Sequence, residues 1–297
     1  NLLLVPCCGM GNRLQAIICG QLFAEDTGRG FYVNWESEGH DCGAEFTDLF
    51  QPVFRRMETI PDDIVCYSSI QKHMGCATDR YLFLLKKDLK ESFFTAKSDH
   101  SANVAIFTCH LFLKYFHDQR FNMRLRQLIE AVRPEIKAKA DNYQADKFTE
   151  STIGVHIRRK DWKSQKMMGY YFKHMDKFMK EGGNVSFFVC SDDEDSLSEM
   201  REKYPNVHTY PARSLGRGSL SEIEDALIEM LLLSRTRFLL GTPGSTFSAM
   251  AQSIGGMPAN FKHGFSWSRR DVLHGNLSIK MLIKRFYHRS LLAIQGY

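Results

Sequence analysis

The sequence predicts an α/β protein built on parallel, doubly wound sheets. Apolar runs of strand length alternate with segments of helical spacing in both halves of the chain, glycine-containing turns follow the first and the last predicted strand, and no fixed-period repeat is present. Strands that alternate with helices form parallel sheets, because each helix carries the chain back to the start of the next strand. With 297 residues, the chain is long enough for two domains.

The first half opens with a β-α-β unit. Leu2 to Val5 predicts a buried strand, Asn12 to Gly28 carries apolar residues at helical spacing, and Phe31 to Trp35 predicts the next strand. Residues 36–110 show loop, aromatic and turn signals without a clear period.

Two predicted helices, over residues 124–132 and 135–148, are separated by Pro134 and lead to a polar segment, Thr149 to Thr152. We place a domain boundary in this polar segment, because few apolar residues are available there to hold two elements together. The two predicted domains therefore span residues 1–150 and 151–297.

The second half repeats the alternation more regularly. Its predicted strands are Ile153 to Arg158, Val185 to Cys190, a short strand near Val207, and Arg237 to Leu240, and its predicted helices are Tyr170 to Lys180, Glu194 to Lys203, Ser221 to Leu233 and Ser245 to Ile254. An open parallel sheet of this kind binds ligands outside the carboxyl ends of its strands.

The composition is that of a globular protein and disfavours several function classes. Hydrophobic residues make up 43% and charged residues 25% of the chain, and the formal net charge is only +5. The basic residues are dispersed, so we expect no nucleic-acid partner. No run of 18 apolar residues occurs, so we expect no membrane span in this chain.

Cysteine usage and glycosylation sequons leave the compartment open. None of the eight cysteines forms a C-x-x-C pair, which disfavours zinc-ribbon and thioredoxin chemistry. N-x-S sequons at Asn184 and Asn276 matter only in a secretory lumen. The chain starts at Asn1 without an initiator methionine, so anything upstream has been removed or omitted, and both compartments stay open: the cytoplasm, or the ER or Golgi lumen if an upstream anchor was removed.

A basic motif ends the first strand of the second half. The segment Gly154 to Asp161 reads G-V-H-I-R-R-K-D and places His156, Arg158 and Arg159 at the carboxyl end of a β-branched run. A guanidinium fits phosphate oxygens bidentately, so this end of the strand suits a diphosphate. Adjacent strand residues point to opposite faces, so we expect only one of the two arginines to touch the ligand directly. The alternative is an exposed arginine pair in ordinary salt bridges.

A glycine loop follows the first strand of the chain. Gly9, Gly11, Asn12 and Arg13 precede a predicted helix, where glycines let backbone N–H groups approach a phosphate or sugar. The loop resembles a dinucleotide fingerprint, but its sixth position is Leu14, which disfavours a nicotinamide enzyme. A tight strand-helix turn without a ligand is the alternative.

An acidic run follows the second strand of this half. Ser191 to Asp195 reads S-D-D-E-D, and D-x-D carboxylates hold divalent cations in many sugar-nucleotide enzymes. The competing interpretation is a helix N-cap by Ser191 or Asp192 with acidic residues in the first turn. We favour the cap, with either Asp192 or Asp193 turned toward the ligand, and predict no metal ion.

A third loop, Gly241 to Thr246, follows the last predicted strand and opens a helix. Its hydroxyl groups, from Ser245 and Thr246, and its backbone amides predict a second anion cradle. No lysine follows the glycines, so the loop is not a Walker motif. A simple N-cap by Ser245 or Thr246 is the alternative, and it is compatible with phosphate binding.

Together these motifs resemble the GDP-fucose-dependent fucosyltransferases, the group that includes α-1,6-fucosyltransferases, the nodulation fucosyltransferase and protein O-fucosyltransferases. The resemblance covers the opening G-x-G-N-R-L, the H-x-R-R-x-D motif from His156 to Asp161, the block Phe188 to Pro205, and the block Leu227 to Gln252. It implies a GT-B-like fold of two Rossmann-type domains with a cleft between them: an N-terminal, Rossmann-like, acceptor-facing domain over 1–150 and a C-terminal, nucleotide-sugar-binding domain over 151–297.

The resemblance also implies roles for individual residues. Arg158 would neutralise the donor diphosphate, and His156 with Glu229 would lie near the guanine. The remaining donor-binding positions that it implies are Gly9, Gly11, Asn12, Arg13, Arg159, Asp192, Asp193, Ser245 and Thr246. No cofactor is implied besides GDP-fucose as the donor substrate, and the implied reaction is an inverting, metal-independent transfer of fucose to a glycan or glycoprotein acceptor.

The chain departs from the family pattern at two positions. Glu229 stands where the α-1,6 enzymes have aspartate, and no glutamate follows the R-R-x-D motif where those enzymes carry a candidate general base. Asp161, Asp41 or Glu45 are the candidates that remain for the base, and Asp161 is our choice. Two alternatives stay open: the same fold with another donor, such as a UDP-sugar, and a glycan- or nucleotide-binding protein that has lost catalysis.

Overall fold

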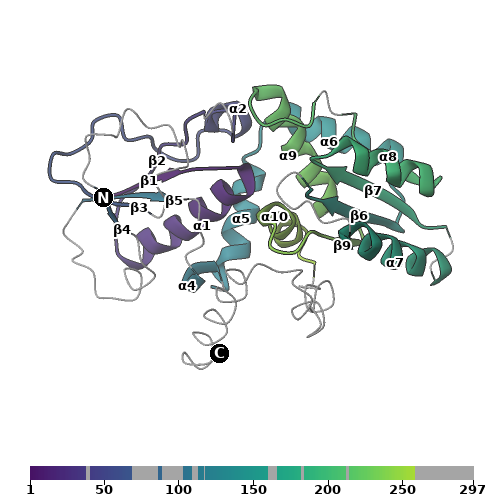
Figure 1. Cartoon of the computed structure of the whole chain (residues 1–297). Coiled ribbons are helices and arrows are strands. Elements are labelled where there is room, and N and C mark those ends of the chain that lie inside the picture. Colours follow the sequence, from purple (N-terminus) through teal and green to yellow (C-terminus); the bar gives the residue numbers. More distant parts are fainter. Residues whose placement is uncertain are drawn as a thin grey trace, which may run out of the picture. The chain divides into compact units, whose positions relative to one another are not determined.

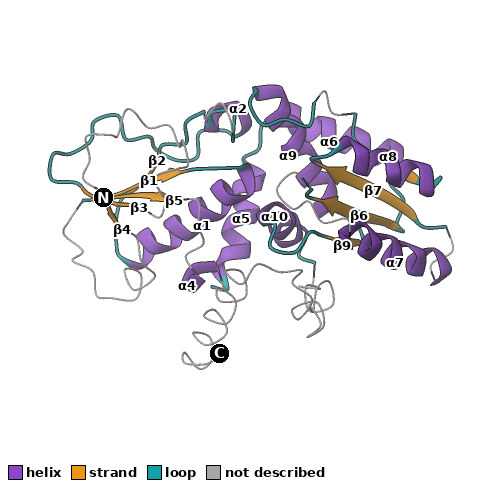
Figure 2. Ribbon diagram, viewed as in Figure 1, coloured by secondary structure: helices purple, strands orange, loops and turns teal. Residues whose placement is uncertain are grey.

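The computed structural model is an α/β protein with two parallel sheets, as predicted (Figures 1 and 2). It describes residues 1–37, 41–68, 86–88, 103–108, 113–116, 118–159, 166–181, 184–211 and 214–257. Asn1–Pro258 forms one compact unit. None of the described helices is long and apolar enough to cross a membrane.

The first sheet has five strands in the order β2-β1-β5-β3-β4, and every pairing is parallel. Its strands are β1 (Leu2–Pro6), β2 (Phe31–Val33), β3 (Val65–Ser68), β4 (Lys86–Asp88) and β5 (Val104–Thr108). The helices described in this half are α1 (Met10–Asp26), α2 (Phe46–Leu49), α4 (Leu113–Phe116), α5 (Arg120–Glu130) and α6 (Pro134–Lys147). The predicted opening unit is confirmed as β1, α1 and β2.

The second sheet has four strands in the order β8-β7-β6-β9, again all parallel. Its elements are β6 (Thr152–Ile157), α7 (Lys166–Glu181), β7 (Ser186–Ser191), α8 (Glu194–Lys203), β8 (Val207–His208), α9 (Leu220–Ser234), β9 (Phe238–Leu240) and α10 (Thr246–Gly255). The chain runs outward from β6 to β8 and then returns to the other side of β6 with β9. The switch point of this sheet therefore lies between β6 and β9, and a ligand site is expected at their carboxyl ends.

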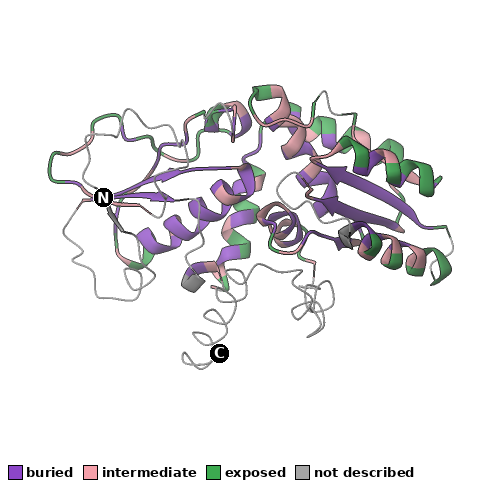
Figure 3. Cartoon of the chain, in the orientation of Figure 1, coloured by how far each residue is buried: buried purple, intermediate pink, exposed green. Residues whose placement is uncertain are grey.

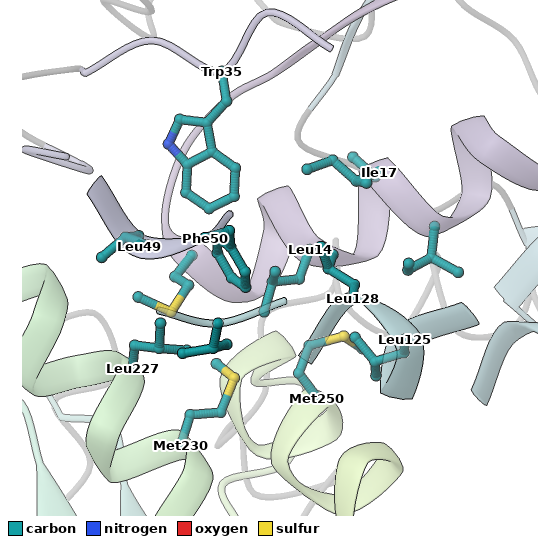
Figure 4. Packing of buried hydrophobic residues seen from close by; sticks show 14 of the residues in the cluster. Leu14, Ile17, Trp35, Leu49, Phe50, Leu125, Leu128, Leu227, Met230 and Met250 are labelled. Carbon is teal, nitrogen blue, oxygen red and sulfur yellow. The ribbon is translucent and has the colours of Figure 1, made fainter. Parts of the chain in front are cut away.

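Helices from both halves of the chain share one hydrophobic core (Figures 3 and 4). Leu14 of α1, Leu125 of α5, Leu227 and Met230 of α9, and Met250 of α10 are all fully buried in this cluster. The boundary that we predict near residue 150 falls in the connection between α6 and β6, and the division of the chain into two domains there remains a prediction.

Candidate functional site

The motifs of the second half meet at the carboxyl ends of β6, β7 and β9. Thr242, in the loop after β9, joins two of these strands, because its Oγ1 donates to the carbonyl of His156 at 2.8 Å and accepts from the backbone N–H of Arg158 at 2.9 Å. Tyr171 of α7 supports the same point, since its hydroxyl donates to the His156 carbonyl at 2.9 Å. Our sequence analysis gave neither Thr242 nor Tyr171 a role, although a threonine directly after a strand-ending glycine is a visible signal.

His156 is held as a neutral, buried imidazole. Its ring stacks on Phe247 at a centroid distance of 4.8 Å, and Nδ1 lies 2.7 Å from Oγ of Ser248. Burial, with the nearby charges of Arg158 and Arg217, lowers the pKa of His156 to about 3. At neutral pH the ring therefore acts as a flat hydrogen-bonding group, not as a general acid.

The two adjacent arginines have different surroundings, as strand alternation predicts. Arg158 directly follows β6, and strand alternation continued for one residue would place it on the face of the sheet that carries His156. Arg159 turns to the start of α8, where Nη1 donates to Oγ of Ser196 at 3.1 Å and lies 3.7 Å from Oδ2 of Asp193. Arg159 is thus engaged with the start of α8, and we expect its predicted donor-binding role to be indirect.

The acidic run begins a helix, as the cap interpretation predicts, but the capping residue is different from the ones we named. Asp193 is the N-cap of α8, and its Oδ2 accepts from the backbone N–H of Ser196 at 3.0 Å and from its hydroxyl at 2.6 Å. Ser191 instead accepts from the N–H of Asp193 at 3.1 Å. Because Asp193 is engaged in the cap, we expect Asp192 to be the aspartate of this pair that faces the ligand.

Asp192 ties the ends of β6 and β7 together. Its Oδ1 accepts from the backbone N–H of Arg159 at 2.7 Å, and its Oδ2 lies 3.5 Å from Nη2 of Arg217.

Within the described part of the chain, no group of three or more His, Cys, Asp or Glu side chains is placed to hold a metal ion.

The first glycine loop lies directly against the start of α10. A Cβ atom at Gly11 would lie 2.7 Å from the backbone nitrogen of Phe247 and 2.9 Å from Oγ1 of Thr246, so only glycine permits this approach of α1 to α10. A Cβ at Gly9, by contrast, would meet open space, and its φ of −66° is ordinary. The packing needs Gly11, whereas Gly9 leaves room beside the loop. Asn12 is partly exposed in the first turn of α1.

Arg13, a predicted donor-binding residue, is buried inside the protein. Its exposed fraction is 0%, its Nε donates to the carbonyl of Cys8 at 2.7 Å, and Nη1 donates to the carbonyl of Glu36 at 2.8 Å. Its guanidinium also lies 5.1 Å from the ring centroid of Trp35. Cys8 has a φ of +65°, a conformation that is strained for a residue with a side chain. We therefore expect Arg13 to fix the shape of the glycine loop from within.

Ser245 is the N-cap of α10, as the simpler interpretation of this loop proposes. It is 3% exposed and accepts from the N–H of Ser248, and Thr246 in the first turn is partly exposed. A capped helix start still presents backbone N–H groups and a positive dipole end to an anion. Both the cap and the predicted phosphate-binding role of Thr246 are compatible with this geometry.

Glu229 lies on α9, over the face of the second sheet that carries His156. Its charge acts on the buried thiol of Cys190, which is the register partner of His156 on the neighbouring strand. Burial, together with the charge of Asp225, raises the pKa of Glu229 to about 8. No hydrogen bond or ion pair joins Glu229 to another described residue, so its carboxyl group is available to a ligand.

The three candidates for the general base lie in different parts of the chain. Asp161, our first choice, lies outside the described residues. Glu45 is the N-cap of α2, and its backbone N–H donates to Oδ2 of Asp48 at 2.8 Å. Asp41 is partly exposed, in the loop before α2.

Comparison with known proteins gives structural relatives only. No family model matches the sequence, and no curated protein is similar to it in sequence. A solved NodZ α-1,6-fucosyltransferase soaked with GDP-fucose superposes with a TM-score of 0.64 at 20% identity, over 85% of this chain and 92% of that one. POFUT1 in complex with GDP has a TM-score of 0.54 at 14% identity, over 86% and 96% of the two chains. Arabidopsis thaliana FUT1, a mutant in complex with GDP, has a TM-score of 0.55 at 19% identity, over 86% and 68%. The chain thus has the GT-B-like fold of these fucosyltransferases.

Proposed function

We propose that this protein is a glycosyltransferase that transfers fucose from GDP-fucose to a glycan or glycoprotein acceptor. The observation that carries the proposal lies at the switch point of the second sheet: a neutral histidine that senses the charge of Arg158, and the capped start of a helix, lie at one strand edge. Such an arrangement suits a nucleoside diphosphate. Each of the solved relatives named above is a protein soaked with or bound to GDP-fucose or GDP.

In this proposal the protein recognises two parts of the donor, the diphosphate and the guanine. The diphosphate contacts Arg158 and the N–H groups at the start of α10, where charge and helix dipole both favour an anion. The guanine lies near His156 and Glu229, because guanine offers two neighbouring N–H donors to a carboxylate. A uracil presents one N–H beside carbonyl oxygens, so Glu229 favours guanine over the UDP-sugar alternative.

The chemical step is proposed as a single inverting displacement. The acceptor hydroxyl attacks the anomeric carbon of fucose in line with the departing GDP, and a base removes the hydroxyl proton. As the bond to GDP breaks, negative charge grows on the β-phosphate, and Arg158 with the α10 terminus stabilises it. Preorganised charges of this kind make a metal ion unnecessary. Asp161 remains our proposed base.

Turnover with Arg158 variants tests this function. GDP release from GDP-fucose, with an acceptor screen of glycans and glycoproteins, should be abolished or reduced by two or more orders of magnitude in Arg158→Ala. Arg201→Ala is the matched control, because Arg201 forms a surface ion pair with Glu194 at 2.8 Å on α8. If the protein binds GDP-fucose but neither variant nor wild type turns it over with any acceptor, the non-catalytic alternative replaces the proposal.

A further inference from the structure

Arg217, which our sequence analysis gave no role, lies at the same sheet edge as the motif arginines. Its Nη2 is 3.5 Å from Oδ2 of Asp192, the residue that follows β7. Its charge and that of Arg158 both reach the imidazole of His156. The chain therefore brings a second guanidinium to this edge from a loop far along the sequence.

The loop that carries Arg217 is fixed by its own hydrogen bonds. The carboxylate of Glu222, in the first turn of α9, accepts from the N–H groups of Gly218 at 2.8 Å and Ser219 at 3.0 Å. Its other oxygen accepts from the hydroxyl of Ser214 at 2.5 Å. These bonds lower the pKa of Glu222, with the Ser214 bond as the largest cause, so the carboxylate stays ionised and the loop is ordered around it.

A segment from the first half of the chain holds the same loop from outside. The N–H of Gly43 donates to the carbonyl of Arg217 at 2.8 Å. A Cβ atom at Gly43 would overlap the carbonyl group of Gly218, so this approach requires glycine. Hydrogen bonds from Gly43 and within the loop thus fix the backbone of Arg217 from two sides. They hold Arg217 at this sheet edge.

The pairing of Arg217 with Asp192 leaves most of the guanidinium available. Charge-assisted N–H···O bonds are usually about 2.7–2.9 Å long, whereas this contact is 3.5 Å. Asp192 is the only ion-pair partner of Arg217 within the described residues, and the Arg217 side chain is 33% exposed. A guanidinium has five donors, so this contact can hold the side chain in place and still leave donors for an anion.

We propose that Arg217 is a second donor-binding cation, which contacts the diphosphate of the nucleotide sugar together with Arg158. This inference rests on the proposed function. A planar guanidinium on an ordered loop binds phosphate oxygens in a fixed direction, and two such groups divide the charge of a diphosphate between them. Asp192 then acts as a positioning residue, because it holds Arg217 beside the end of β6 through the backbone of Arg159.

The test compares GDP with guanosine, which has the same base and no phosphate. Guanosine is followed by saturation-transfer NMR, which reaches millimolar affinities, and GDP by calorimetry. Loss of a charge-assisted hydrogen bond weakens binding by about ten- to a hundredfold, so Arg217→Ala should weaken GDP by that factor and leave guanosine unchanged. Arg217→Lys, which keeps the charge but loses the fork, should recover part of the loss, and Arg201→Ala should match the wild type.

Two results would overturn the inference, and they are distinguishable. Equal GDP affinity in wild type and Arg217→Ala, or an equal loss for GDP and guanosine, removes Arg217 from the phosphate site and leaves the proposed function intact. Failure of the wild-type protein to bind either GDP or guanosine removes the proposed function, and the inference with it.

Discussion

The unusual state of Glu229 leads to a pH dependence of nucleotide binding. Its pKa of about 8 means that the free protein carries a proton on this carboxyl group at neutral pH. In the proposed donor site, guanine presents two N–H donors to Glu229, and these bind the carboxylate and not the protonated acid. Binding of GDP must therefore release this proton, and the affinity should rise with pH until Glu229 is ionised in the free protein.

The size of the effect follows from the pKa. With a pKa of about 8, roughly one molecule in a hundred is ionised at pH 6 and roughly half are ionised at pH 8, so GDP affinity should increase about fiftyfold, or about 2 kcal/mol, over this interval. Calorimetry in two buffers with different heats of ionisation counts the protons released. At pH 6.5 we expect the wild type to release close to one proton more per GDP than Glu229→Gln does.

The control is Glu229→Gln, which has nearly the same shape and no titration. The phosphate of GDP also titrates near neutral pH, but it does so equally for both proteins, so the difference between their pH slopes isolates Glu229. Identical slopes for wild type and Glu229→Gln would refute the reasoning and would place the carboxyl group away from the base.

Three further predictions concern the architecture that supports the site. Gly11→Ala forces a Cβ atom to within 2.7 Å of the backbone of α10, so it should lower the free energy of unfolding, measured by chemical denaturation, by about 1–3 kcal/mol. Gly9→Ala places its Cβ atom in open space and should leave stability unchanged. Equal effects of the two variants would contradict the α1–α10 contact. Thr242→Val removes the hydroxyl that bonds to the buried His156 carbonyl and to the Arg158 N–H, so it should lower the free energy of unfolding by about 1–3 kcal/mol and weaken GDP binding. Thr242→Ser should restore both stability and binding. A fully stable Thr242→Val protein would disprove the role of this hydroxyl. Arg13→Met removes the donors to two backbone carbonyls and should lower the free energy of unfolding by about 1–3 kcal/mol. Its unfolding midpoint should fall by the same amount with GDP present and with GDP absent. A loss of GDP binding without a loss of stability would instead place Arg13 in the donor-binding site.

The second half of the fold was predictable because its signals are local. Each apolar strand there is followed by a helix with a recognisable start, and the predicted strand Val185 to Cys190 corresponds to β7, Ser186–Ser191. In the first half, β3 has only four residues and β4 only three, and β4 reads K-K-D. Such strands are identified by their pairing with β5 and β3, which is nonlocal information that a single sequence does not carry.

The site was predictable where a motif coincides with a strand end, and not elsewhere. His156 and Arg158 were identifiable because they end a β-branched run. Arg217 and Gly43 were not, since their roles depend on a contact between segments more than 170 residues apart in the chain. For Arg13 the local motif was a poor guide. Its place in a glycine loop predicts a ligand contact, but its side chain is buried by packing against Trp35 and by hydrogen bonds to two backbone carbonyls, which the local sequence does not reveal.

The most direct test of the central claim is calorimetric titration of the wild-type protein with GDP, UDP and GDP-fucose, each in EDTA and in Mg²⁺. We predict that GDP and GDP-fucose bind at least about tenfold more tightly than UDP, which corresponds to about 1.4 kcal/mol, and that EDTA has no effect. Tighter binding of UDP, or binding that requires Mg²⁺, would contradict the account and would return Asp192 and Asp193 to consideration as metal ligands.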